Sequence, residues 1–478
     1  MRKDHDLLGD ILIPDEVYYG AQTQRALDLC NPSQEKLYDY PELIYSIAAI
    51  KKACALAHKD LKVLSADKAD AIIQAAGEVM DGKIGSKEFP VDIINGGGGV
   101  SVHMNLNEVL ATRACELLNG NKGSGIVHPN THVNMGQSTN DVLPAAMKLA
   151  LYLDIKDVIK STKVLQKSFA KKAKEFKNIV KVSRTCLQDA VPITLGQFYS
   201  ASSSFLARQI SELEGLLIDC RKIPLGGTAV GTGLNRFYGS SKKITTNLSN
   251  IFGEEITEEE NLFDGLQFAD IYIKAMGALK SLATGVSKMG RDIRLMSSGP
   301  RAGLEEITIA PVQNGSSIMP GKVNPAMPEL MNVVCYKICG NAVGVTMAVE
   351  GGELELNVWE PVVIVDLYGS CKLLTNTLGL FAEKCVDTIT ANKQICSRDA
   401  ENSLSIAAVV SAVAGYQKGT EVAKLAAKEG LSIKAAAVKT GVMTQDEADK
   451  LLDPLMLTDA KLSGKLLLSL ALKEHKTS

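Results

Sequence analysis

Apolar side chains recur every three or four residues over most of the chain between about residues 141 and 396. The clearest run places Leu279, Leu282, Val286, Met289 and Ile293 at spacings of 3, 4, 3 and 4. Similar runs occur at about 143–175, 197–219, 327–349 and 363–384. This spacing is typical of long helices packed side by side in a bundle. Five such helices cannot bury every apolar face within one chain, so we expect oligomerisation to complete the core.

The segments on either side of this region have different patterns. Residues 1–35 are polar and predict an irregular arm, and residues 41–120 alternate helical periodicity with the glycine run at 96–99. After about residue 397 the helical segments shorten, with Ser432 as a predicted N-cap and Thr444 with Glu447 as a predicted capping box. The sequence therefore predicts an all-α chain of three domains. These are an N-terminal helical domain (1–140), a central long-helix bundle (141–396) and a small C-terminal helical domain (397–478).

Composition narrows the class of protein. The chain has 478 residues, too many for one ordinary core. Aromatic residues make up only 5%, and the net charge of −2 gives no reason to expect nucleic acid or an anionic membrane as a partner. Ten scattered cysteines, Cys30 among them, contain no CxxC pair and predict free thiols in a reducing compartment. No apolar stretch follows the N-terminus and no uninterrupted apolar run approaches the ~20 residues of a membrane span, so we expect a cytoplasmic protein.

Four polar segments punctuated by glycine interrupt the apolar pattern and are candidates for site loops. They are GGGGVSVHMNLNE (96–108), HPNTHVNMGQSTND (128–141), SRTCLQD (183–189) and GSSIMPGKVNP (315–325). Each serine or asparagine alone is more often a loop cap than a ligand contact. Together the loops offer hydroxyl and amide donors and a lysine, which suits a small carboxylate substrate. These donors are Ser101, Ser138, Thr139, Thr185, Ser316, Ser317, Asn140, Asn324 and Lys322.

Neither a cofactor nor a metal is expected from these loops. The glycine run lacks the GK[ST] of a P-loop. Strands and helices do not alternate along the sequence as they do in a dinucleotide-binding fold, and metal-ligating residues do not cluster. No GxSxG element suggests a Ser-His-Asp hydrolase.

The segment GSSIMPGKVNP resembles the signature of the aspartase/fumarase superfamily, which includes aspartases, class II fumarases, argininosuccinate lyases and adenylosuccinate lyases. The resemblance covers nearly the whole chain. It extends over LIPDEVYYGAQTQRA, HMNLNEVL, HPNTHVN, QSTNDVLP, LQDAVPITLGQ, GGTAVGTGLN, SSGPRAGL and GGELELNV. It implies an all-α, three-domain homotetramer whose long helices share one bundle and whose active sites each take loops from three subunits.

The resemblance also implies roles for single residues. Ser316 is the expected general base, acting as an alkoxide stabilised when a mobile loop closes and excludes water. It would remove a proton beside a carboxylate and leave an aci-carboxylate dianion. Residues matching those that hold this dianion are Ser138, Thr139 and Ser317. Lys322, Asn324 and Thr185 match residues that bind the other carboxylate, Asn140 lies near the departing nitrogen, and Ser101 is a further substrate contact.

Four positions depart from the usual family pattern. Val100 stands for a threonine, His103 for an asparagine, Cys186 for a histidine or glutamine, and Glu353 for a glutamine or an aromatic residue. Glu329 would partner the missing histidine. Val100 and Cys186 fall where relatives contact the leaving amine. A primary ammonium has three N–H donors and needs acceptors, whereas a quaternary ammonium has none and favours an apolar pocket near an anion.

These departures resemble ergothionase, a superfamily member that releases trimethylamine from ergothioneine and leaves thiolurocanate. Glu353, or alternatively Lys384, would then accept charge at the substrate ring. An alkylated-amine lyase is therefore the favoured function. Aspartate ammonia-lyase, which converts L-aspartate to fumarate and ammonia, is the alternative, and fumarase ranks third because Cys186 replaces its usual histidine. A non-catalytic structural protein with this fold is a further alternative, which the retention of Ser316, Lys322 and Asn324 opposes.

Overall fold

The computed structural model describes residues 1–29 and 31–477, with side chains to residue 469. The chain divides into two compact units. Unit 1 contains residues 1–160, 209–283 and 334–375, and unit 2 contains residues 161–208, 284–333 and 376–478.

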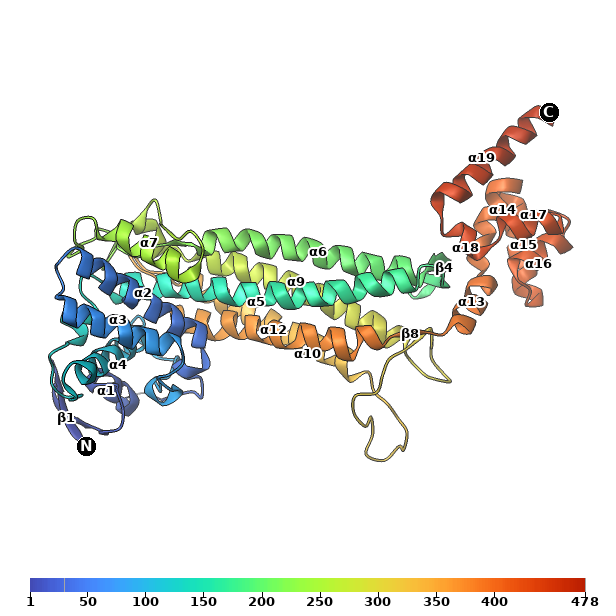
Figure 1. Cartoon of the computed structure of the whole chain (residues 1–478). Coiled ribbons are helices and arrows are strands. Elements are labelled where there is room, and N and C mark those ends of the chain that lie inside the picture. The colour runs from blue at the N-terminus through green and yellow to red at the C-terminus, as the bar shows by residue number, and fades with distance from the viewer. Residues whose placement is uncertain (30, 478) are drawn as a thin grey trace. The chain divides into compact units, whose positions relative to one another are not determined.

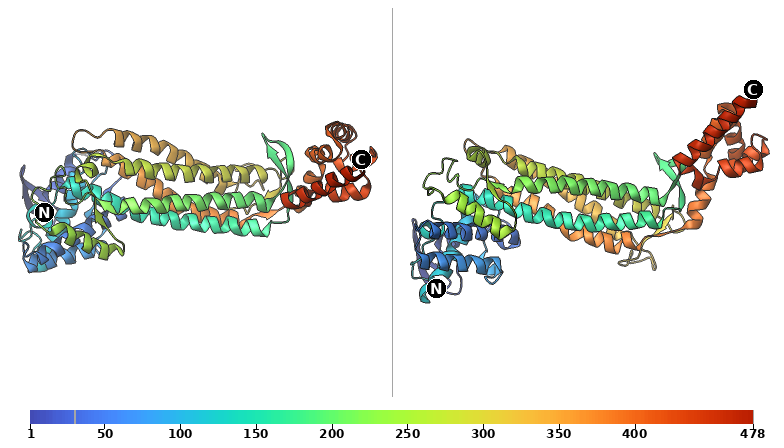
Figure 2. Two further views of the ribbon diagram at one scale, coloured as in Figure 1. Left: turned by 90° about the horizontal axis from the view of Figure 1, so that it is seen from above. Right: turned by 45° about the horizontal axis from the view of Figure 1, so that its top comes forward.

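Five long helices contribute a segment to each unit, and within each unit these segments lie side by side (Figures 1 and 2). They are α5 (Thr139–Glu175), α6 (Leu195–Cys220), α9 (Asp270–Met296), α10 (Ala326–Glu350) and α12 (Gly369–Lys384). The predicted all-α class and the positions of the five helices are confirmed.

The apolar seam predicted on α9 is buried as its spacing requires. Leu279, Leu282, Val286, Met289 and Ile293 are between 0% and 6% exposed. Positions three and four apart share one helix face, so the seam turns every one of these side chains into the core. Burying a side chain of this kind contributes about 1.5–3 kcal/mol each.

Unit 1 begins with a small subdomain in which α2 (Pro41–Asp60), α3 (Ala66–Met80) and α4 (Val100–Asn119) pack on one another. Proline at the first position of α2 suits a helix start, because the missing N–H would be unpaired there anyway. Helix α4 lies between Gly99 and Gly120, both in the left-handed conformation that glycine adopts without strain. This subdomain positions the start of α4, which lies within the candidate segment 96–108.

The polar N-terminal arm is not irregular, so this prediction was wrong. Strands β1 (Arg2–Asp6) and β2 (Gly9–Ile13) form an antiparallel hairpin, followed by α1 (Ala21–Leu29). The guanidinium of Arg2 donates to the carbonyls of Pro14, Val17 and Tyr19. These bonds join parts of the chain 12 to 17 residues apart, and local hydrophobic periodicity carries no signal for them.

Unit 2 contains the hairpin of β3 (Val180–Thr185) and β4 (Gln188–Thr194), and its C-terminal part is a series of helices. Apolar residues from α14 (Ala407–Ala414) to α17 (Gln445–Leu451) form a separate core between Ile406 and Leu452. Both predicted caps are confirmed, since Ser432 accepts the N–H of Ala435 and Thr444 forms the capping box with Glu447.

The other elements are mostly shorter. In unit 1 they are η1 (Leu37–Asp39), η2 (Ser86–Glu88), η3 (Pro129–Val133), β5 (Lys222–Ile223), α7 (Ser240–Phe252), β6 (Thr257–Glu258), α8 (Leu262–Gln267), α11 (Glu360–Val363) and η4 (Ile364–Tyr368). In unit 2 they are β7 (Ile307–Thr308), η5 (Val386–Thr388), β8 (Thr390–Ala391), α13 (Lys393–Asn402), η6 (Leu404–Ile406), α15 (Tyr416–Glu429), α16 (Ile433–Lys439), α18 (Pro454–Leu457) and α19 (Ala460–Thr477). Strand β5 pairs with β6 in parallel, and β7 pairs with β8 antiparallel. None of the nine described cysteines is in a disulfide, and Cys30 lies outside the described residues.

Helix α10 is unusually apolar. Among the described residues it is the one helix that is long and apolar enough to cross a membrane by length and composition. Its residues Tyr336, Val343 and Met347 lie on one face and are 62–64% exposed. A single chain thus leaves an apolar stripe on α10 open to solvent.

Candidate active site

The glycine run ends where α4 begins and sets the first group of candidate residues. Gly99 has φ +71°, which glycine adopts without strain, and a Cβ there would lie 2.0 Å from the Leu143 side chain, which would have to move. Val100, the first residue of α4, is exposed. Ser101 is half-buried and His103 is fully buried.

The second group lies at the start of α5. Ser138 precedes the helix, its hydroxyl accepts the N–H of Asn140, and its own N–H donates to Asp141. The other oxygen of Asp141 accepts the N–H groups of Gly226 and Thr228, so this buried carboxylate joins the helix start to a glycine-rich loop. Burial raises the pKa of Asp141 although these N–H bonds oppose the shift. The Asn140 amide donates to the carbonyl of Ala229 at 2.8 Å.

A buried polar cluster supports Thr139, the first residue of α5. The Nδ1 atom of His103 lies 2.7 Å from the Thr139 hydroxyl oxygen, and its Nε2 atom lies 2.7 Å from Nζ of Lys51. Lys51 is fully buried on α2 and also donates to the side-chain oxygens of Asn134 and Gln137, each at 2.8 Å. Three acceptors therefore surround the three N–H donors of one ammonium group.

The third candidate segment is the tip of the β3–β4 hairpin. Thr185 and Cys186 are both exposed there. Cys186 and Leu187 are the two central residues of the turn and both have positive φ, +52° and +59°. A two-residue turn of this handedness normally contains asparagine or glycine, so the Cys-Leu pair is strained. The hairpin tip therefore holds the Cys186 backbone in a strained conformation and exposes its thiol.

Buried ion pairs anchor that hairpin within unit 2. Glu306 has no exposed surface, and its carboxylate lies 2.6 Å from the Arg184 guanidinium and 3.0 Å from the Lys181 ammonium. Both cations are on β3, and Arg184 directly precedes Thr185. The network therefore holds the strand that carries the candidate residues.

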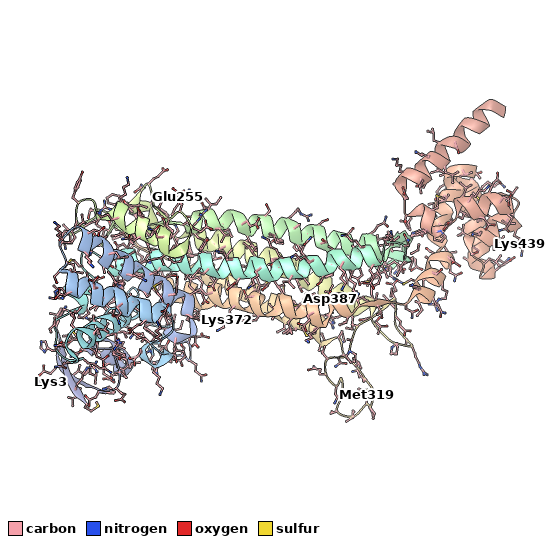
Figure 3. The ribbon with its side chains drawn as sticks, viewed as in Figure 1. Lys3, Glu255, Met319, Lys372, Asp387 and Lys439 are labelled. Atoms are coloured by element: carbon pink, nitrogen blue, oxygen red, sulfur yellow. The ribbon has the colours of Figure 1, made fainter. Side chains whose placement is uncertain are left out.

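The signature loop, residues 315–325, connects β7 with α10 and projects from the helices of unit 2 around the labelled Met319 (Figure 3). The N–H of Gly315 donates to the carbonyl of Lys322, and the amide of Asn324 donates to the carbonyl of Gly315. The Ser316 hydroxyl oxygen accepts the N–H groups of Ile318 at 3.2 Å and Met319 at 3.0 Å. Ser317 and Lys322 are exposed. The loop is thus closed on itself at Gly315 by one backbone bond and one side-chain bond, and Ser316 and Asn324 are half-buried.

The remaining candidates lie at exposed chain turns and helix ends. Glu353 begins a tight turn with Leu356 and is exposed in unit 1. Lys384 is the last residue of α12 in unit 2, where it pairs with the adjacent Glu383 at 2.7 Å. Glu329, which lacks its expected histidine partner, lies 3.6 Å from Arg294.

The candidate residues are divided between the units. Unit 1 contains Val100, Ser101, His103, Ser138, Thr139, Asn140 and Glu353, and unit 2 contains Thr185, Cys186, Ser316, Ser317, Lys322, Asn324 and Lys384. Within the described part of the chain, no three histidine, cysteine or acidic side chains are grouped as a metal ion would need.

Three residues next to the candidates were missed by the sequence analysis. Lys51 interrupts the apolar run of α2 at a position four residues from Ile47 and three from Cys54, which places it on the buried face. That spacing could have identified Lys51 as a buried lysine from the sequence. Arg184 and Glu306 are 122 residues apart, and nothing local marks them as a pair.

The chain matches the family model described as Lyase over residues 9–340 and the model described as Fumarase C C-terminus over residues 406–459. It is 41% identical to the aspartate ammonia-lyase of Helicobacter pylori, over 95% of this chain and 97% of that protein. It is 40% identical to the aspartate ammonia-lyase of Escherichia coli, over 94% of each chain.

Solved structures agree with these matches. A fumarate lyase:delta crystallin from Brucella melitensis shares 40% identity and a TM-score of 0.93, over 96% of this chain and 99% of that chain. A class II fumarase from Schistosoma mansoni shares 34% identity and a TM-score of 0.92, over the same shares of the two chains. The chain is therefore a lyase enzyme and belongs to the aspartase/fumarase superfamily.

Proposed function

We propose that this enzyme is a carbon–nitrogen lyase that uses Ser316 as the base in a 1,2-elimination. The observation that carries the proposal is the pair of backbone N–H groups, from Ile318 and Met319, that point at the Ser316 hydroxyl oxygen. A serine hydroxyl is a weak base in water. Two N–H donors stabilise its alkoxide more than its neutral form and so lower its pKa, in the way an oxyanion hole stabilises developing charge.

The other candidate residues complete the proposed mechanism. Ser316 removes the proton from the carbon next to the one that carries the amine, and the electron pair moves into a neighbouring carboxylate. As that pair returns, a C=C bond forms, the C–N bond breaks, and the amine leaves with the bonding electrons. Ser138, Thr139 and Ser317 donate to the resulting dianion, and each such donor is worth roughly 2.7–4 kcal/mol in comparable sites. Lys322, Asn324 and Thr185 bind the second carboxylate, Ser101 adds a substrate contact, and Asn140 lies beside the leaving nitrogen.

The site is proposed to form between chains of a homotetramer. The exposed apolar stripe of α10, formed by Tyr336, Val343 and Met347, supports an assembly in which other copies cover it. Candidate residues from the N-terminal subdomain, the hairpin and the signature loop would then come from three subunits. The three-domain division at residues 140 and 396 and a cytoplasmic location remain predictions.

Relatives support L-aspartate as the substrate better than the alkylated amine favoured from the sequence. The similar proteins from Helicobacter pylori and Escherichia coli are both aspartate ammonia-lyases, and each similarity covers more than nine-tenths of the chain. A substrate with two carboxylates also suits the two sets of donors. The leading proposal is therefore the conversion of L-aspartate to fumarate and ammonia.

A second candidate is the release of trimethylamine from ergothioneine, with thiolurocanate as the product. It is supported by side chains that differ from the usual pattern. Val100 exposes an apolar surface at the start of α4, and Cys186 exposes a thiol at the hairpin tip. Both fall where an ammonium would need acceptors. The exposed carboxylate of Glu353, or the ammonium of Lys384, would act at the substrate ring.

One ultraviolet assay separates the substrates. Purified enzyme is incubated with L-aspartate, with fumarate plus ammonia, with malate and with ergothioneine. Fumarate absorbs at short wavelength, whereas thiolurocanate, a conjugated product, absorbs further to the red. Rapid turnover of L-aspartate is the expected result. Turnover of ergothioneine alone would show that the enzyme is an alkylated-amine lyase and not an aspartate ammonia-lyase. Turnover of malate alone would indicate a fumarase, and no turnover of any substrate would contradict the proposed lyase.

A further inference from the structure

The side chains around Lys51, in the buried cluster beneath Thr139, define the direction of its hydrogen bonds. Asn134 and Gln137 have amide groups whose NH₂ ends donate to backbone carbonyls, Asn134 to that of Gln137 and Gln137 to those of Val133 and Met135. Their oxygens therefore face Lys51. An ammonium group donates three hydrogen bonds and accepts none, so the third partner of Lys51, the Nε2 atom of His103, must be an acceptor as well.

This assignment determines the tautomer of His103. A neutral imidazole with an acceptor at Nε2 carries its proton on Nδ1, and the NH₂ group of Asn107, 3.3 Å from Nε2, also approaches as a donor. The Nδ1–H group then donates to the Thr139 hydroxyl oxygen at 2.7 Å. Burial and the nearby Lys51 lower the pKa of His103 well below its ordinary value, which agrees with a neutral ring.

The hydroxyl hydrogen of Thr139 is consequently left to donate. Among the residues that the structure describes, this hydroxyl has no hydrogen bond other than the one with His103. A row of donors thus runs in one direction from Lys51 through His103 to Thr139. Hydrogen bonds aligned in this way polarise one another, most strongly where water is excluded.

We propose that Lys51 and His103 are positioning residues that polarise the Thr139 hydroxyl into an obligate donor toward negative charge developing on the substrate. No proton is transferred along the row. The buried positive charge of Lys51 polarises the Nδ1–H group of His103, which in turn polarises the Thr139 hydroxyl. The inference rests on the proposed function, since it takes Thr139 as a ligand of the dianion, and it adds Lys51 to the residues that serve the reaction.

The state of Lys51 gives the proposal a pH dependence. The titratable groups around it are Cys54 and His58 on α2, His103 on α4 and Asp141 on α5. Burial lowers the pKa of Lys51 to about 7, with Asp141 and Cys54 opposing the shift. The ammonium form is therefore lost as the pH rises through that value, and the rate should lose the contribution of the row over the same range.

Two substitutions of His103 separate polarisation from simple support. The side chain of asparagine ends near the position of Nδ1, so His103→Asn keeps a partner for Thr139 and breaks the link to Lys51. Glutamine ends near the position of Nε2, so His103→Gln keeps the Lys51 partner and loses that of Thr139. Lys51→Met removes the charge at similar volume, and Lys52→Met, a change of the adjacent lysine on another helix face, is the matched control.

Steady-state kinetics give the first test. Breaking the row should lower kcat about 10- to 100-fold in both His103 variants and in Lys51→Met, the range for a lost bond to a charged group. KM should change much less, Lys52→Met should behave as the wild type, and the falling limb of kcat at high pH should disappear in His103→Asn. The double variant Lys51→Met/His103→Asn should be no slower than either single variant. Wild-type kcat in His103→Asn, or multiplied losses in the double variant, would overturn the proposal.

Solid-state ¹⁵N NMR of protein with labelled histidine gives a test that needs no substrate and no Lys51 variant. The His103 signals are identified by their loss in His103→Asn. The proposal expects a neutral ring with its proton on Nδ1 at pH 6, and a proton on Nε2 would overturn it. If no substrate is turned over, the proposed function fails while this measurement still decides the tautomer.

Discussion

The start of α5 in unit 1 and the signature loop in unit 2 both carry candidate hydroxyls, but they hold them in opposite ways. Thr139 contacts His103, which in turn contacts Lys51, and neither of these two side chains has any solvent exposure. Ser316 lies on a loop whose side chains are largely exposed and whose shape depends on a few backbone hydrogen bonds. The hydroxyl proposed to receive charge is thus held by a buried core, whereas the proposed base lies on an exposed loop.

The largest expected effect comes from the base itself. Ser316→Ala removes the hydroxyl and should lower kcat by about 10²–10⁴-fold, the usual contribution of general base catalysis. Assembly measured by light scattering should not change, because the side chain takes no part in the core. Val312→Ala, at an exposed position before the signature loop, is the control and should keep its activity. Unchanged turnover in Ser316→Ala would remove the base assignment.

The second prediction tests whether unit 2 also contains a rigid, buried support. Glu306→Ala leaves Lys181 and Arg184 without their buried partner and should cost about 3–5 kcal/mol of stability. Urea unfolding measures the change. Glu305→Ala is the matched control, since the neighbouring carboxylate has no ion pair within 4 Å among the described residues and should lose far less. Equal losses in the two variants would contradict a specific role for the ion network.

The third prediction separates loop shape from stability. A Cβ at Gly315 would lie 2.5 Å from the carbonyl oxygen of Lys322 and 2.7 Å from the backbone nitrogen of Asn324. Gly315→Ala must therefore open the bonds that close the signature loop. We expect kcat/KM to fall about 10- to 100-fold, as for other misplaced catalytic groups, with no change in Tm. A large fall in Tm would show that the loop is part of the core after all.

The fourth and smallest effect concerns a buried group that, unlike Lys51, lacks a matching partner. One oxygen of Glu360 is buried without a hydrogen bond among the described residues, and burial raises the pKa of this carboxyl to about 7. Its folded pKa exceeds the ordinary value, so its stabilising effect is complete at low pH and is lost as the pH rises through about 7. Glu360→Gln should therefore equal the wild type in Tm near pH 4 and exceed it near pH 8. Identical pH profiles of Tm would contradict this.

The spacing of residue types along the chain predicts those features that depend on residues close together in the sequence. The seam from Leu279 to Ile293 is visible because its side chains share one helix face, and the caps at Ser432 and Thr444 involve residues only three apart. The candidate loops were found because glycine and polar residues interrupt an otherwise apolar pattern, and the resemblance to the superfamily supplied the proposed roles.

Features that depend on distant residues were not predictable in this way. The N-terminal hairpin depends on Arg2 reaching carbonyls 12 to 17 residues away, and its charged strands resemble a loop in composition. The pairing of Lys51 with His103 joins α2 to α4 across 52 residues. Val100, Cys186 and Glu353, the residues proposed to select the leaving amine, are separated by 86 and 167 residues, so no local pattern joins them.

We propose that the Ser316 base of one chain acts on a substrate held by the Thr139 region of another chain. Subunit complementation tests it most directly. Ser316→Ala and Thr139→Val chains with different affinity tags are co-expressed, and hybrids containing both are isolated by tandem purification. Each variant alone should be inactive, and the hybrids should regain activity because some sites combine an intact Ser316 with an intact Thr139. Correctly assembled hybrids that remain as inactive as either parent would show that Ser316 and Thr139 do not act together across chains.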